Sequence, residues 1–130
     1  MINGKRILLS FAALMICHFT FAQAAADLLR KGNKVFIIAP GKEDIANGQN
    51  AIKNLNFWQL ADNIQAADIL VNFVFNKKKK EYKIYAEVSN ARSGDLLFKT
   101  KNYNAPLKGT KTVIDKIVKK EIKPLTENTH

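Results

Sequence analysis

The stretch that decides the fold is ADILVNFVFNKKKKEYKIYAEV, residues 67–88. Apolar side chains recur at every second position on both sides of four consecutive lysines, over residues 69–75 and again over residues 82–88. A period of two is typical of a strand with one buried face, and two such runs around a short polar segment predict an antiparallel hairpin. The lysines, residues 77–80, are then expected to form a four-residue loop at the hairpin tip, where water solvates their charges.

Further strands are predicted on both sides of this hairpin. Residues 34–39, KVFIIA, form a continuous β-branched and aromatic run, which is typical of a central strand buried on both faces. A shorter strand is expected within residues 56–62, NFWQLAD. LLFKTKNYN, residues 96–104, follows a turn at Gly94 and ends before Pro106. Its lysines mark it as an edge strand, because charged side chains there discourage pairing with other chains.

Two segments carry apolar residues at helical spacing. The first begins near Glu43, and the second begins at Thr110 and is expected to end at Pro124, since proline cannot continue a helix. The apolar stripes comprise Ile45, Ile52 and Leu55 in the first helix, and Ile114, Ile117, Val118 and Ile122 in the second.

The predicted order of elements is strand, helix, four strands, helix. This order favours an α+β two-layer sandwich, in which a mostly antiparallel sheet of about 4–5 strands carries both helices on one face. The length suits a single domain, predicted to span residues 25–130 with a polar C-terminal tail from about residue 124.

Residues 1–24 have the three parts of a secretory signal peptide: a basic start, an interrupted apolar run, and the small-x-small sequence AQA. Cleavage would leave 130 − 24 = 106 residues and remove Cys17, the chain's one cysteine. The expected location is therefore the bacterial periplasm or the extracellular medium. An uncleaved anchor is the alternative, and lipid attachment at Cys17 is disfavoured because Ile16, a large residue, precedes it.

Three segments in a fixed order, ADILVNFVF, EYKIYAEV and NARSGDLLFKT, precede the last helix. This outline resembles the amino-terminal domain of the translocation protein TolB and of related exported envelope proteins of unknown function. The resemblance covers about residues 34–123. It implies an envelope-located, non-catalytic interaction domain.

The residues give no support to an enzyme. Outside the signal segment the chain holds one histidine, His130, and no cysteine, which removes the usual general base and the usual zinc ligands. Adjacent Glu43 and Asp44 are explained as partners of a helix dipole, and Asp62 and Asp68 as loop or strand-start residues. No glycine-rich phosphate loop follows a strand. We therefore expect no catalytic, cofactor-binding or metal-binding residues and no cofactor.

Charge and strand parity suggest where a partner could bind. The chain has 21 basic and 11 acidic residues, and removal of Lys5 and Arg6 with the signal gives a net charge of 19 − 11 = +8. This excess attracts polyanions but does not identify one. Two tyrosines of the predicted strands have the parity of the exposed sheet face. The candidate binding surface comprises Lys77, Lys78, Lys79, Lys80, Tyr85, Lys99, Lys101 and Tyr103.

Two functions stay open at this level. The chain is expected to be a protein-interaction module that docks on an unidentified envelope protein through the uncovered sheet face or the edge strand. The alternative is a binder of an acidic envelope polymer or an anionic membrane surface, using the lysine-rich tip and the basic face of the last helix. Aromatic residues beside lysines could also stack on single-stranded nucleic acid, but an exported protein seldom meets nucleic acid.

Overall fold

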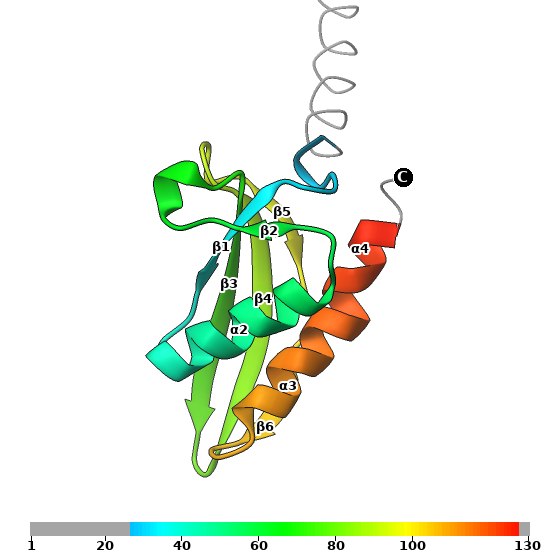
Figure 1. Ribbon diagram of the computed structural model, residues 1–130. Helices are drawn as coiled ribbons and strands as arrows, with labels where there is room; N and C mark the ends of the chain where they lie inside the picture. Colours follow the sequence, from blue (N-terminus) through cyan, green and yellow to red (C-terminus); the bar gives the residue numbers. More distant parts are fainter. Residues whose placement is uncertain (1–26, 128–130) are drawn as a thin grey trace, which may run out of the picture.

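The computed structural model describes residues 27–127. The predicted signal peptide with Cys17, and the terminal His130, lie outside the described residues. In chain order the elements are β1 (Lys34–Ile38), α2 (Lys42–Asn54), β2 (Gln59–Leu60), the 3₁₀ turn η1 (Ile64–Ala66), β3 (Ile69–Lys78), β4 (Glu81–Asn90), β5 (Leu96–Lys99), β6 (Tyr103–Pro106), α3 (Thr110–Ile117), the π-helical turn η2 (Val118–Ile122) and α4 (Lys123–Glu127) (Figure 1).

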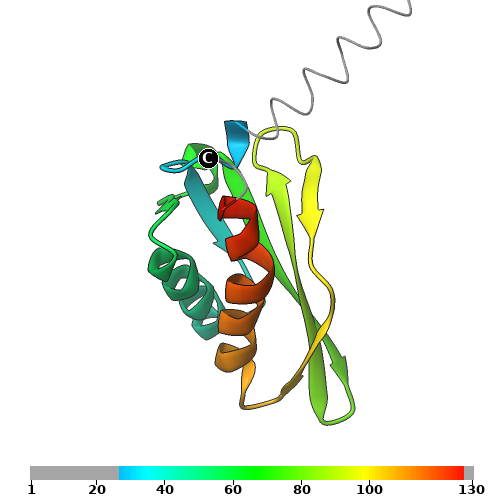
Figure 2. The ribbon, with the colours of Figure 1, turned by 90° about the vertical axis from the view of Figure 1, so that its right-hand side faces the viewer.

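The predicted α+β two-layer sandwich is confirmed. Six strands form one sheet in the order β2-β1-β3-β4-β5, and β6 pairs with β4. Pairing is parallel where β1 meets β2 and β3, and antiparallel where β4 meets β3, β5 and β6. Figures 1 and 2 show α2 and the last helix on the same side of the sheet. The opposite side of the sheet, called the open face below, has no described helix over it.

The core lies between the hairpin and the helices. Inward-facing residues of β3 and β4 are almost completely buried, among them Phe73 at 1% exposure and Ile84 at 0%. Gly48 lets α2 approach closely, because a Cβ at this position would lie 2.8 Å from Cε2 of Phe73 and 2.9 Å from Cγ2 of Ile37. The apolar stripe predicted for the last helix is confirmed, since its residues from Ile114 to Ile122 are buried.

The first strand differs from the sequence prediction. β1 was expected to be buried on both faces, but its side chains alternate: Val35 and Ile37 are buried, while Phe36 and Ile38 are half-buried. The reason is that only one face of the sheet is covered by helices. A continuous apolar run therefore leaves two large hydrophobic residues on the open face.

The predicted third strand of the meander is also divided, into β5 and β6. Both pair with β4 on the same side, and the chain between them leaves regular pairing. Buried Thr100 bridges the gap: its backbone N–H donates to the Ala86 carbonyl at 2.9 Å, and its Oγ1 accepts the Ala86 N–H at 2.9 Å. The hydroxyl thus replaces a backbone carbonyl in the ladder.

Pro124 does not end the last helix, contrary to the prediction. Helical structure continues through α4 to Glu127. Proline lacks an N–H and clashes with the carbonyl four residues earlier, so an ordinary α-helix would break or kink here. The π-helical turn η2 stands directly before α4 and widens the helix at the place where proline would otherwise disturb it.

Candidate functional site

The four-residue loop expected at the hairpin tip is wrong in its length. Lys77 and Lys78 belong to β3, where they pair with Tyr82 and Glu81 across the hairpin. Only Lys79 and Lys80 make the turn, and Lys79 has a φ of +52°. Two-residue turns need such a conformation because it follows the right-handed twist of the strands. The lysine run is therefore partly a strand end and partly a turn, and all four residues are exposed.

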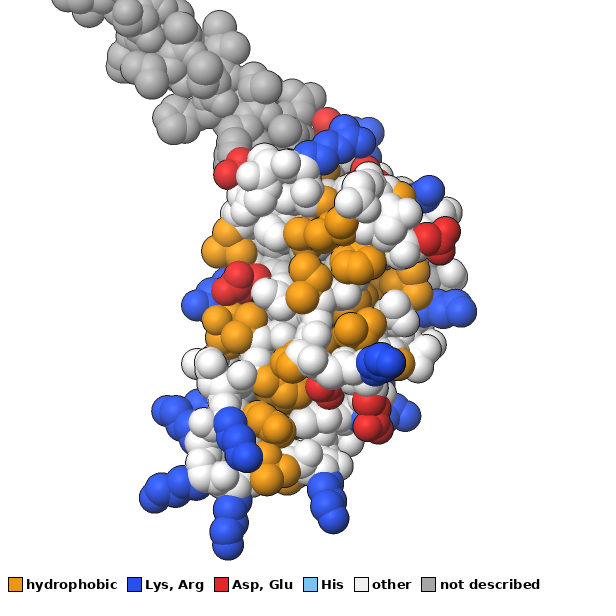
Figure 3. Space-filling view, turned by 90° about the vertical axis from the view of Figure 1, so that its left-hand side faces the viewer, with side chains coloured by type: hydrophobic (Ala, Val, Ile, Leu, Met, Phe, Trp, Pro, Cys, Tyr) orange, Lys and Arg blue, Asp and Glu red, His pale blue; other side chains and the backbone are white. Residues whose placement is uncertain are grey.

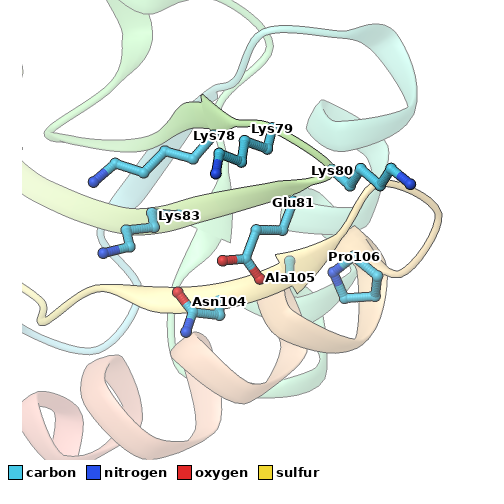
Figure 4. Close-up of a pocket in the computed structure, with 8 residues that line it drawn as sticks. All are labelled: Lys78, Lys79, Lys80, Glu81, Lys83, Asn104, Ala105 and Pro106. Atoms are coloured by element: carbon cyan, nitrogen blue, oxygen red, sulfur yellow. The ribbon is translucent and has the colours of Figure 1, made fainter.

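A groove lies beside this turn, on the part of the sheet where β6 joins the hairpin. We call it the tip groove. It has a volume of about 740 Å³ and is lined by Lys78, Lys79, Lys80, Glu81, Lys83, Asn104, Ala105 and Pro106 (Figure 4). Register explains the grouping, because Glu81 faces Pro106 and Lys83 faces Asn104 across the β4–β6 pair.

The lysines of the tip groove have no acidic partner. Within the described part of the chain, the ion pairs shorter than 4.0 Å are Arg30–Asp27 and Arg92–Asp68, and neither contains a lysine. Glu81 therefore forms no ion pair with the lysines around it, although it lies among them (Figure 4). The groove keeps an uncompensated positive charge.

Tyr85 and Lys99 lie together on the open face. Strand parity predicted this position for Tyr85. The Lys99 Nζ lies 4.6 Å from the centre of the Tyr85 ring. Tyr85 also faces Val74 across the hairpin, and Glu87 faces Lys99 across the β4–β5 pair. A cation over an aromatic face is attracted to its π-electrons, which holds this lysine against the sheet.

The position predicted for Tyr103 is wrong, because this residue lies on the helix-covered side of the sheet and not on the open face. It faces Ile84 across the β4–β6 pair, and its hydroxyl donates a hydrogen bond to Glu121 Oε1 at 3.1 Å. Desolvation, this hydrogen bond and the negative charge of Glu121 raise the pKa of the Tyr103 hydroxyl above 10.0. Lys101 and Lys116 lie 5.3 and 5.7 Å from the centre of its ring. Lys101 and Tyr103 are thus separated from the tip groove lining.

The apolar part of the open face is not predicted from the sequence. Phe36 faces Leu70 and Ile38 faces Asn72 across the β1–β3 pair, and all these side chains are half-buried. A further recess of about 310 Å³ is found where β1 ends beside β3, and Pro40 and Phe75 are among its lining residues. Figure 3 looks at the β1 edge of the sheet, from the left of Figure 1, and shows hydrophobic side chains running down this edge, with lysine and arginine side chains gathered at the lower end.

One free edge continues from this apolar surface. β1 pairs with β3 only as far as Asn72, whereas β3 runs on to Lys78, so no described strand pairs with that side of the last part of β3. The other edge is less open to a new strand: β5 and β6 are interrupted at Thr100, and β6 ends at Pro106, which has no N–H to donate.

Two of the carboxylates considered for catalysis, Asp68 and Asp44, have structural roles. Asp68 Oδ2 accepts the Lys34 N–H at 3.0 Å, which ties the start of β1 to the start of β3. Asp44 in the first turn of α2 accepts a hydrogen bond from the Thr110 hydroxyl at 3.4 Å.

Among residues 27–127, no three His, Cys, Asp or Glu side chains are grouped so that they could hold a metal ion. Within the same residues, no helix has both the length and the apolar character needed to cross a bilayer.

Comparison with known proteins gives a likeness of fold. No protein-family model matches the chain, and no curated protein matches it. TolB from Acinetobacter baumannii is similar over 72% of this chain and 29% of its own, with 5% identity and a TM-score of 0.51.

Two further solved structures are similar at lower TM-scores. A dodecamer of a PelC variant from Paraburkholderia phytofirmans matches 73% of this chain and 88% of its own at 13% identity and a TM-score of 0.48. An uncharacterized lipoprotein B from Nitrosomonas europaea matches 75% and 77% at 10% identity and a TM-score of 0.33. At such identities a likeness concerns the fold alone, so the expected resemblance to TolB is supported only as a shared arrangement of strands and helices with part of that protein.

Proposed function

We propose that this protein is a non-catalytic, exported module of the bacterial envelope that docks on another protein through its open face. The observation that carries the proposal is the row of half-exposed hydrophobic side chains on a sheet face that no described helix covers. Phe36 and Leu70 face each other there, and Val74 faces Tyr85. Contiguous apolar surface of this kind is typical of protein-binding sites.

The edge of β3 supports the same site. The apolar recess at Ile38 and Val74 adjoins the part of β3 that no described strand pairs with. A partner could therefore add main-chain hydrogen bonds at the β3 edge to side-chain contacts on the open face, a frequent mode of peptide recognition. The signal-like residues 1–24 and the likeness of fold to TolB support an envelope location. The structural roles of Asp44 and Asp68 support the proposal that the module is not an enzyme.

The test is capture of partners from the native envelope by the exported protein and by two single variants. Leu96→Asp places a charge at the rim of the open face, where Leu96 faces Ser89 and is 53% exposed. Ile64→Asp is the matched control, because Ile64 lies on η1 and is 41% exposed. We expect Leu96→Asp to abolish capture and Ile64→Asp to preserve it, with little change on raising the salt concentration.

Equal capture by both variants would refute docking through the open face. Export is tested separately by mass spectrometry of the protein recovered from a bacterial host, for which we expect a new amino terminus at Ala24 or Ala25. A chain that retains Met1 would remove the support for an exported module.

A further inference from the structure

The tip groove has a chemistry that the proposed docking on the open face does not use. Its four lysines and one glutamate give 4 − 1 = +3 in formal charge. None of these lysines has a carboxylate within 4.0 Å in the described part of the chain. Amine groups that are held side by side without internal compensation attract a ligand that carries several negative charges.

The floor of the groove differs from its rim. Pro106 at the end of β6 is exposed and contributes an apolar ring, and the lysine side chains add apolar stems beneath their charged ends. A suitable ligand therefore combines negative groups at its edges with apolar C–H surface in its middle. A chain of sugar rings that carry carboxylates has this combination.

The shape of the site favours a long ligand. Lys83 of the tip groove and Tyr85 both belong to β4. Tyr85 lies two residues after Lys83, which is about 7 Å further along the strand. Glu81, Lys83 and Tyr85 alternate with buried residues of β4 and so share one face of that strand. This face of β4 therefore leads from the turn to the Tyr85–Lys99 pair, and a linear chain can contact both.

We infer that the tip groove binds a linear acidic polysaccharide along β4, with its lysines contacting the carboxylates and its apolar floor contacting the sugar rings. The directions of the lysines favour this ligand over an anionic membrane. In Figure 4, the side chain of Lys80 points away from those of Lys78 and Lys83. The ammonium groups thus diverge instead of all facing one flat lipid surface.

The experiment measures binding of polygalacturonate to protein recovered after expression of the full-length chain in a bacterial host. Titration calorimetry at several salt concentrations compares the wild type with Lys78→Gln/Lys79→Gln/Lys80→Gln/Lys83→Gln, which removes the four positive charges of the groove. The matched control is Lys111→Gln/Lys119→Gln/Lys120→Gln/Lys123→Gln on the last helix, which removes the same number of lysines, all of them exposed. Glutamine suits the control because its helix propensity is close to that of lysine.

We expect the groove variant to bind at least about tenfold more weakly and to lose most of its salt dependence, since fewer counterions are released. The helix variant should bind within about twofold of the wild type, because its net charge has changed but its groove has not. Glu81→Gln should strengthen binding, because it removes the one carboxylate of the groove. Thermal unfolding followed by circular dichroism checks that each variant is folded.

Three results would overturn the inference. Equal weakening by the two quadruple variants would show attraction to net charge alone. Neutral dextran bound as tightly as polygalacturonate would show that carboxylates are not recognised. Tighter binding to phosphatidylglycerol vesicles, lost in the groove variant, would make a membrane the ligand. The Leu96→Asp variant should bind polygalacturonate normally, so this inference and the proposed docking function can fail independently.

Discussion

The two faces of the β3–β4 hairpin consist of alternate residues of the same strands, but they have different physical roles. On the covered face, Val71, Phe73 and Ile84 are at most 1% exposed and pack beneath the helices. On the open face, Val74 and Tyr85 are only half-buried, and charged Lys83 and Glu87 stand beside them. The covered face therefore supplies stability, whereas the open face and its tip are free to carry binding chemistry.

The largest expected effect comes from two neighbouring residues that point to opposite faces. Phe73→Ala should lower the free energy of unfolding by about 3–5 kcal/mol, because it empties a fully buried site. Val74→Ala should lower it by about 1 kcal/mol or less, because Val74 is already partly in water. Denaturant titration measures both. Similar losses in the two variants would contradict the assignment of the faces.

A smaller loss should follow from crowding the covered face. Gly48→Val places side-chain atoms where a Cβ alone would lie 2.8 Å from the Phe73 ring. We expect a loss of about 1–3 kcal/mol, the usual effect of overpacking a core. The comparison is Ala46→Val on the exposed side of the same helix, for which the melting temperature should change much less. Unchanged stability in Gly48→Val would mean that α2 does not lie so close to β3.

The edge where β5 gives way to β6 should respond to loss of one hydroxyl. Thr100→Val leaves the buried Ala86 N–H without its acceptor, which we expect to lower the free energy of unfolding by about 1–2 kcal/mol. Thr100→Ser retains the hydroxyl and should recover most of the loss. Hydrogen exchange of the Ala86 amide, faster in Thr100→Val than in Thr100→Ser, is the direct measurement.

The turn that joins β3 to β4 should be improved by substitution. Lys79→Gly should raise the free energy of unfolding by about 1 kcal/mol, because a φ of +52° strains a residue with a Cβ but not glycine. Lys80→Gly is the comparison, since Lys80 has no positive φ, and it should not stabilise the protein. A loss of stability in Lys79→Gly would disprove the two-residue turn.

The smallest effect concerns ionisation of Tyr103 on the covered side. In a Tyr82→Phe/Tyr85→Phe background, absorbance titration should place the Tyr103 pKa above 10.0, and Glu121→Gln should lower it. A raised pKa means that the folded state holds the phenolic proton more tightly than the unfolded state. Its contribution to stability is therefore present below about pH 10 and is lost as the pH rises through the folded-state pKa. A titration unaffected by Glu121→Gln would contradict the hydrogen bond.

The candidate site could be predicted in part. The lysine run, Tyr85 and Lys99 were found from charge and strand parity, and the structure places the first two on the β3–β4 hairpin and Lys99 on β5 beside it. Tyr103 was assigned to the wrong face because LLFKTKNYN was treated as one regular strand. The irregular segment at Thr100 shifts the alternation by one residue, and such a shift moves every later side chain to the other face. Phe36 and Ile38 were missed because burial on both faces was expected for β1.

The sequence by itself determined the hairpin, the two amphipathic helices and the α+β class. These features follow from local periodicity, because side chains two residues apart in a strand, or three and four apart in a helix, share a face whatever surrounds them. Only the tertiary structure decided which face of the sheet the helices cover, how β6 joins β4 to form the tip groove, and how η2 allows the last helix to continue through Pro124. Each of these depends on contacts between residues far apart in the chain, and local patterns carry no information about them.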